Sequence, residues 1–117
     1  MNFKVVPSQR FQRAAKPLLK KYPSLKNELR ILGKSLAESP EQGTSLGKNC
    51  YKTRLAIQSK GKGKSGGARV ITYLLTDDEK VILLTIYDKA QKADLEPGEL
   101  DHLLDSLTFP DDESPEP

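Results

Sequence analysis

The spacing of hydrophobic residues changes along the chain from strand-like to helical, then to strand-like, and finally to helical again. A short apolar run over residues 3–6, closed by Pro7, predicts a first strand. Ser8 is a good N-cap for the segment that follows. That segment has apolar residues at helical spacing, which predicts a helix with one buried face: Phe11, Ala14, Ala15, Leu18 and Leu19.

Proline and serine residues punctuate this helical region. Pro17 lies inside the first pattern and predicts a kink or a split into two short helices. Pro23 and Ser24 open a second helix, which ends near Ser39 and Pro40 and carries a single stripe of Leu25, Leu29, Leu32 and Leu36. The short connection indicates an antiparallel helical hairpin.

The second half of the chain is dominated by strand patterns. Residues 41–49 contain two glycines and show no periodicity, which predicts a loop. Apolar and polar residues then alternate over 50–58, and two further strands over 69–75 and 81–88 flank a five-residue acidic turn. A simple turn pairs Leu75 with Val81 and places Arg69 opposite Tyr87, with both side chains on one face. Residues 59–67 form a basic, glycine-rich stretch, and residues 96–107 predict a short final helix with four leucines.

This order of elements predicts one α+β domain over residues 1–107. An N-terminal helical hairpin packs on one face of a mostly antiparallel four-stranded sheet, a short C-terminal helix follows, and the opposite face of the sheet remains open. Residues 108–117 form an acidic, proline-rich tail that we expect to be disordered.

Charge divides the chain more sharply than its formal net charge of +3 suggests. Residues 1–92 contain nineteen basic and seven acidic residues, whereas residues 93–117 contain nine acidic residues and no Lys or Arg. A basic body of this size favours a polyanionic partner, most often nucleic acid. The alternative is a lysine-rich surface that only improves solubility.

Other features limit the class of protein. Cys50 is the single cysteine, so an intrachain disulfide is excluded and a reducing compartment is favoured; we expect Cys50 to be a small core residue. One Cys and one His do not make a zinc site, and we expect neither a metal nor another cofactor. The sequence contains no signal-peptide pattern and no run of 18 apolar residues, so we expect a cytoplasmic protein without membrane contact.

Three segments resemble the RelE/ParE superfamily of bacterial toxins, in particular its HigB-like branch. They are KKYPSL at 20–25, GKSGGARVITY at 63–73 and IYDKAQKADL at 86–95. The resemblance implies a RelE-like fold, expression beside a cognate antitoxin protein, and cleavage of mRNA in the decoding site of the ribosome. It further implies a metal-independent reaction in which the ribose 2′-OH attacks the adjacent phosphate and basic side chains replace the usual histidine pair.

The resemblance also implies site residues. Arg69 matches the arginine that grips the phosphate, while Lys89 and Lys92 match basic positions after the last core strand. Lys60, Lys62 and Lys64 lie in a loop where relatives keep lysines, and a lysine crowded by other cations has a lowered pKa that suits a general base. We therefore expect catalytic roles for Arg69, Lys62, Lys64 and Lys89, and RNA-binding roles for Lys52, Arg54, Lys60, Tyr87 and Lys92.

Each of these assignments has a purely structural alternative. The loop lysines can form a solvated loop that only attracts phosphate, and Arg69 can be an ordinary edge-strand arginine. Tyr87 either stacks on a base from the open face or packs over Arg69 as support. Lys89 and Lys92 can be ordinary surface residues, and His102, among acidic neighbours in the last helix, is expected to be a surface histidine.

Three functional hypotheses remain on the sequence alone. The first is the ribosome-dependent endoribonuclease, and the second is a ParE-like toxin that binds DNA gyrase without catalysis. The third is a degenerate RNA-binding relative with no toxicity, because the chain has no Tyr after Tyr87, where several relatives place one near the C-terminus. The acidic tail either folds over the basic face as an internal mimic of RNA or is only a solubilising extension.

Overall fold

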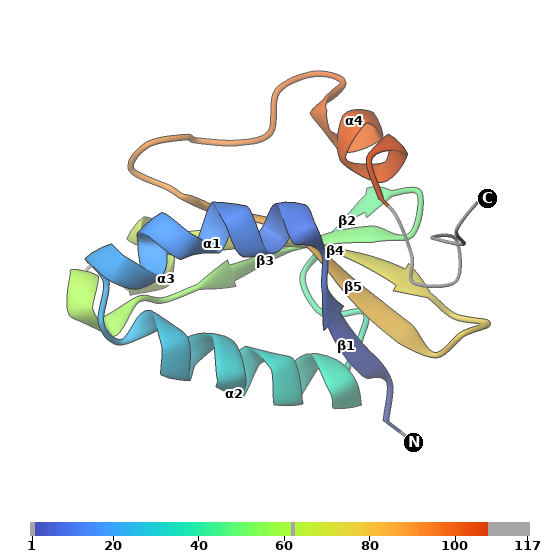
Figure 1. Cartoon of the computed structure of the whole chain (residues 1–117), viewed down its shortest axis with the longest axis horizontal. Helices are drawn as coiled ribbons and strands as arrows, with labels where there is room; N and C mark the ends of the chain where they lie inside the picture. The colour runs from blue at the N-terminus through green and yellow to red at the C-terminus, as the bar shows by residue number, and fades with distance from the viewer. Residues whose placement is uncertain (1, 62, 108–117) are drawn as a thin grey trace, which may run out of the picture.

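The structure is a computed structural model that describes residues 2–61 and 63–107, without the side chains of residues 64 and 65. Lys62 and the acidic tail 108–117 therefore lie outside the described residues. The elements, in chain order, are β1 (Lys4–Pro7), α1 (Gln9–Lys21), α2 (Leu25–Glu38), β2 (Thr44–Gly47), β3 (Cys50–Leu55), the 3-10 turn η1 (Gln58–Lys60), α3 (Gly63–Gly66), β4 (Ala68–Leu75), β5 (Lys80–Asp88) and α4 (Glu99–Asp105). Helices α1 and α2 lie on one face of the sheet (Figure 1).

The helical hairpin follows the predicted pattern except at Pro17. The Ser8 side chain caps α1 by accepting a hydrogen bond of 3.0 Å from the Phe11 amide. Helix α1 continues through Pro17, so the predicted split does not occur. Pro17 and Arg13, whose carbonyl loses its helical partner, are both exposed, and water can replace the missing hydrogen bond there.

The sheet is mixed and has five strands rather than the four predicted. Their order is β1-β5-β4-β3-β2, with β1 parallel to β5 and every other pair antiparallel. The extra strand, β2, lies in the segment predicted to be a loop and pairs with β3. Lys48 and Asn49 have φ of 55° and 62°, as a tight two-residue hairpin turn requires. The strand has only four residues, of which three are exposed, so it leaves no alternation in the sequence.

The β4–β5 hairpin confirms the central pairing and corrects its outer end. Arg69 lies opposite Tyr87 as predicted. An irregularity between Ile71 and Thr72 then shifts the register by one residue, so Leu75 pairs with Lys80 instead of Val81. Such a bulge bends the hairpin and increases its twist.

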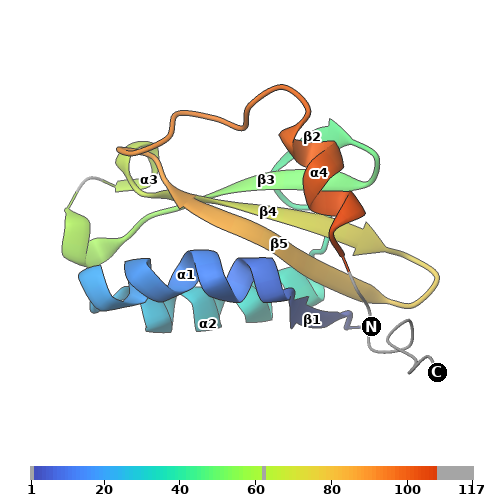
Figure 2. The ribbon, with the colours of Figure 1, turned by 45° about the horizontal axis from the view of Figure 1, so that its top comes forward.

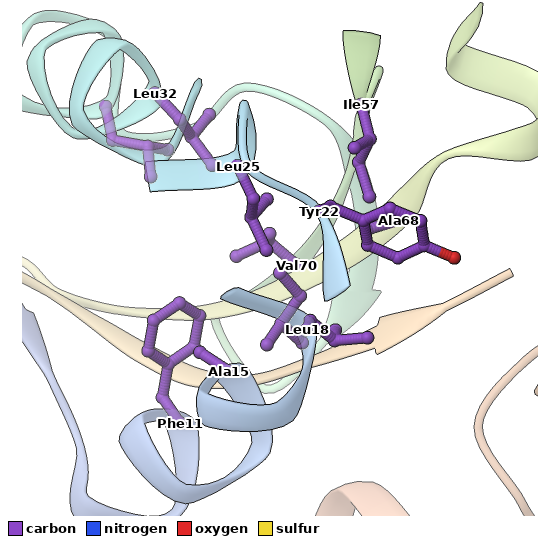
Figure 3. Close-up of a cluster of buried hydrophobic side chains, with 11 residues drawn as sticks. Phe11, Ala15, Leu18, Tyr22, Leu25, Leu32, Ile57, Ala68 and Val70 are labelled. Atoms are coloured by element: carbon purple, nitrogen blue, oxygen red, sulfur yellow. The ribbon is translucent and has the colours of Figure 1, made fainter. Parts of the chain in front are cut away.

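Buried side chains form one cluster on each face of the sheet. The first lies between the sheet and the helical hairpin and includes Phe11, Leu18, Leu25 and Val70 (Figure 3). The second contains Cys50, Ile71, Leu84, Tyr87 and Leu103, with further leucines from α4 and the preceding loop packed against it. The face predicted to be open is therefore covered in part by residues 89–107 (Figure 2). Cys50 is fully buried, in agreement with its predicted core role.

Two glycines offer a test of how closely the backbone packs before β4. A Cβ at Gly67 would lie 2.1 Å from the Leu55 carbonyl oxygen, whereas a Cβ at Gly33, inside α2, would meet nothing within 4 Å. We predict that Gly67→Ala lowers the free energy of unfolding by about 1–3 kcal/mol. The matched Gly33→Ala raises it by about 0.5–1 kcal/mol, because alanine favours the helix. Urea unfolding checks both values, and a neutral Gly67→Ala variant contradicts the close approach.

Candidate nucleic-acid interface

Three neighbouring strands place Arg54, Arg69 and Tyr87 in one row on the face of the sheet opposite the helical hairpin. Arg54 in β3 pairs with Arg69 in β4, and Arg69 pairs with Tyr87 in β5. Directly opposed residues point to the same face of a sheet, so the two guanidinium groups and the phenol share one surface. Arg54 is exposed, whereas Arg69 is only 5% exposed and its Nη1 donates a hydrogen bond of 3.2 Å to the Ala68 carbonyl.

Lys52 extends this row, because residues two apart in a strand share a face. Its Nζ lies 3.2 Å from Oδ1 of Asp94, which comes from the loop after β5. The same oxygen accepts a hydrogen bond of 2.9 Å from the Leu95 amide and one of 3.4 Å from the Tyr87 hydroxyl. The Leu95 amide and then Lys52 hold the pKa of Asp94 below its ordinary value, so Asp94 is a carboxylate at neutral pH.

Tyr87 is buried beneath this loop rather than presented to solvent. Its side chain is 7% exposed, and Lys92 Nζ lies 5.5 Å from the centre of its ring. Burial, followed by the nearby Asp94 carboxylate, raises the pKa of Tyr87 to about 12. The phenol is therefore a hydrogen-bond donor at neutral pH. Tyr87 lies opposite Arg69 in the neighbouring strand, and stacking on a base requires the loop above it to move.

Two further ion pairs fasten the acidic segment to the basic body. Lys92 binds Glu99 at the start of α4, and Lys48, in the β2–β3 turn, binds Asp101. Burial alone would raise the pKa of Glu99, but hydrogen bonds from Lys92 and the Glu96 amide, together with the nearby positive charges, outweigh it and lower that pKa. Lys92 therefore lies over the Tyr87 ring and already holds a carboxylate.

Lys60 lies on the other face of the sheet from Arg69. Its ammonium forms a buried ion pair with Asp88 at the end of β5, and the Tyr22 hydroxyl donates a hydrogen bond of 2.7 Å to the same carboxylate. The two side chains of the ion pair are 8% and 0% exposed. The Ala90 amide completes the set with a hydrogen bond of 2.9 Å to Asp88. This network joins the end of α1, the turn before α3 and the loop that carries Lys89.

The remaining predicted catalytic lysines are placed only in part. Lys62 lies outside the described residues, and Lys64 is described only by its backbone, within α3. Lys89 is half-buried, and its amide donates a hydrogen bond of 3.0 Å to the Gly67 carbonyl, next to the start of β4. This bond keeps Lys89 near the strand end that carries Arg69.

Sequence reasoning missed the acidic residues of this site. By charge alone the C-terminal acids form a separate block, although Asp94 follows Lys92 by two residues, a spacing that signals a partner for the basic strands. His102 is exposed, as predicted, and its Nε2 lies 3.1 Å from Nη2 of Arg10 in α1. Within residues 2–61 and 63–107, no group of three or more His, Cys, Asp or Glu residues could hold a metal ion. In the same part of the chain, no helix is long and apolar enough to cross a membrane.

Comparisons with known proteins give a family and a similar fold. Residues 3–108 match the model of the RelE toxin of the RelE/RelB toxin–antitoxin system. The fold is similar to that of a double arginine-to-alanine mutant of the E. coli toxin RelE in the free state, with a TM-score of 0.56 and 19% sequence identity. That similarity covers 80% of this chain and 90% of the E. coli chain. The chain belongs to the RelE toxin family, whose members pair with an antitoxin.

Proposed function

We propose that this toxin is a ribosome-dependent mRNA endoribonuclease of the HigB-like branch, acting in the cytoplasm and restrained by a cognate antitoxin. The observation that carries the proposal is the row of Arg54, Arg69 and Tyr87 across three strands, extended by Lys52. Three cations and a phenol on one face suit the phosphates of a single RNA strand.

The proposed reaction is attack of a ribose 2′-OH on the adjacent phosphorus. The new P–O bond closes a 2′,3′-cyclic phosphate, the bond to the 5′-oxygen breaks, and that oxygen takes up a proton to leave as a 5′-OH. Negative charge builds up on the equatorial oxygens of the pentavalent phosphorane during this step, and a fixed positive group beside them lowers the barrier. We assign that role to Arg69, because its guanidinium is a planar fork that can bind two phosphate oxygens once the loop above it has moved.

The lysines serve the proton transfers and the substrate backbone. We assign the role of general base to Lys62 or Lys64. Lys89 directly follows the last residue of β5 and supplies a further positive charge there. Lys52, Arg54 and Lys92 bind phosphates on either side of the reacting one. We leave Lys60 out of the RNA-binding set, because its ammonium is held by Asp88 on the opposite side of the sheet.

RNA binding without cleavage is the second candidate function. It is favoured by the burial of Arg69 and Tyr87, which are 5% and 7% exposed beneath the acidic loop. On this hypothesis the protein occupies the decoding site and blocks translation, while the mRNA stays intact.

Induced expression in bacteria separates these functions. We expect protein synthesis to stop and primer extension to reveal new 5′ ends within translated regions of mRNA. Arrest of translation with intact transcripts indicates binding without cleavage. Continued translation together with loss of supercoiling by purified gyrase indicates a ParE-like toxin and overturns the proposal.

A further inference from the structure

The carboxylate of Asp94 occupies the point where two donors of the basic face converge. Oδ1 of Asp94 lies 3.2 Å from Lys52 Nζ and 3.4 Å from the Tyr87 hydroxyl. The two donors come from strands β3 and β5, on either side of Arg69 in β4. An oxygen with negative charge, between a cation and a phenol, is the chemistry that a phosphate oxygen would present at the same point.

The segment that carries Asp94 covers the face that the proposed function requires to be open. Arg69 and Tyr87 lie on two inner strands and point to the face that would have to be open, but both side chains are buried. The cover consists of the loop after β5 and helix α4, which cross the sheet on the side opposite α1 and α2 (Figure 2). Its apolar side chains pack on the second core cluster: Leu95, Leu100, Leu103, Leu104 and Leu107. Its acids Asp94 and Asp101 pair with Lys52 and Lys48 of the sheet region. Glu99 pairs with Lys92 within the cover itself.

The contacts of Asp94 are of a kind that a ligand can displace. Its side chain is 63% exposed, and an exposed ion pair contributes little net free energy because water and salt screen it. The Leu95 amide, its nearest partner, moves together with Asp94. An RNA strand that also contacts Arg54 and Arg69 offers more charge to the face than the single carboxylate does.

We infer that Asp94 occupies a phosphate subsite formed by Lys52 and Tyr87, and that RNA binds this face by displacing the Asp94 loop. The inference rests on the proposed function and adds to it a competing group within the chain itself. The free protein is then partly self-masked, and its affinity for RNA is lower than the basic face alone would give.

Asp94→Asn tests this competition with little change in shape. Asparagine keeps an oxygen for the Leu95 amide but loses the charge that holds Lys52. The matched control is Asp78→Asn, which removes the same charge from an exposed residue in the turn at the far end of the β4–β5 hairpin. The measurement is fluorescence anisotropy with a short labelled single-stranded RNA that carries 2′-deoxy substitutions and therefore cannot be cleaved by 2′-OH attack.

We expect Asp94→Asn to tighten RNA binding about three- to fivefold relative to Asp78→Asn, the size expected for loss of one exposed ion pair. The difference should shrink at high salt, because salt already weakens the competing pair. In a Lys52→Gln background, which weakens binding by itself, Asp94→Asn should give no further gain. Thermal unfolding of all variants checks that the fold is retained.

Three outcomes overturn the inference in different ways. If Asp94→Asn and Asp78→Asn bind RNA equally well and with measurable affinity, the internal competition is wrong and the RNA-binding face stands. If neither variant nor the wild-type protein binds RNA or ribosomes, the proposed function fails and the inference fails with it. A gain that persists in the Lys52→Gln background also contradicts the subsite, because it then does not act through Lys52.

Discussion

Replacing Arg69 with lysine should slow cleavage of ribosome-bound mRNA by about 100-fold or more, the size found when one preorganised donor to a transition-state charge is removed. Lysine keeps the positive charge but loses the planar fork that can hold two phosphate oxygens at once. The long side chain also keeps most of the packing beside Tyr87, where Arg69 is 5% exposed. The measurement is the single-turnover rate of mRNA cleavage on stalled ribosomes.

The control for this variant is Arg30→Lys, an exposed residue of α2 on the other side of the molecule. It should cleave at the wild-type rate. Ribosome binding by the Arg69→Lys protein, measured by co-sedimentation, should fall much less than the rate. Wild-type cleavage by the Arg69→Lys protein contradicts the assignment of Arg69. A loss of rate that equals the fraction of unfolded protein also contradicts it.

Asp88→Asn should lower the free energy of unfolding by about 3–5 kcal/mol, because it leaves the buried Lys60 ammonium without its counter-charge. Asparagine also weakens the hydrogen bond with the Tyr22 hydroxyl, which lies 2.7 Å from the carboxylate. Urea unfolding measures the loss. The exposed Asp78→Asn should change stability by less than about 0.5 kcal/mol. Adding Lys60→Met to Asp88→Asn should recover part of the loss, since it removes the unpaired charge.

The same carboxylate predicts a pH dependence. Burial alone would raise the pKa of Asp88, but hydrogen bonds from Lys60, Tyr22 and the Ala90 amide outweigh it and lower that pKa. A carboxyl with a lowered folded-state pKa stabilises the protein above its unfolded pKa of about 3.9 and loses that contribution as pH falls through the folded value. The difference in the free energy of unfolding between wild type and Asp88→Asn should therefore be largest at neutral pH and disappear in acid. A gap that does not change with pH contradicts the ion pair.

Local patterns predicted much of the fold because local chemistry determines those parts. The Ser8 cap and the leucine stripe of α2 follow from capping chemistry and periodicity. The opposition of Arg69 to Tyr87 was predicted from a simple turn, but it holds only because a bulge offsets the different turn pairing of Leu75 with Lys80. Neither periodicity nor turn length indicates the bulge between Ile71 and Thr72. Strand β2 is too short to show alternation, and its tight turn at Lys48 and Asn49 lacks a glycine within the two turn residues.

The candidate site was predicted as a list of cations and not as an arrangement. Strand order brings Lys52, Arg54 and Arg69 to one face, which the alternation of β3 and β4 already indicated. The fate of Lys60 depends on a partner 28 residues away, Asp88, and no spacing rule connects the two. The leucines of the last helix predicted a buried stripe but not the surface that this stripe covers. The sequence therefore did not predict that this segment covers Tyr87.

Mapping of mRNA ends on translating ribosomes, with a normal message and one carrying a 2′-deoxy nucleotide at the cleavage position, tests the proposed chemistry most directly. With the normal message, the wild-type protein should produce a new end within the decoding site and a 2′,3′-cyclic phosphate on the upstream fragment. With the 2′-deoxy message, the ribosome should stop at the same place and the mRNA should stay intact, because the attacking hydroxyl is missing. Cleavage of both messages, or of neither while the protein is bound to the ribosome, would contradict attack by the 2′-OH at this face.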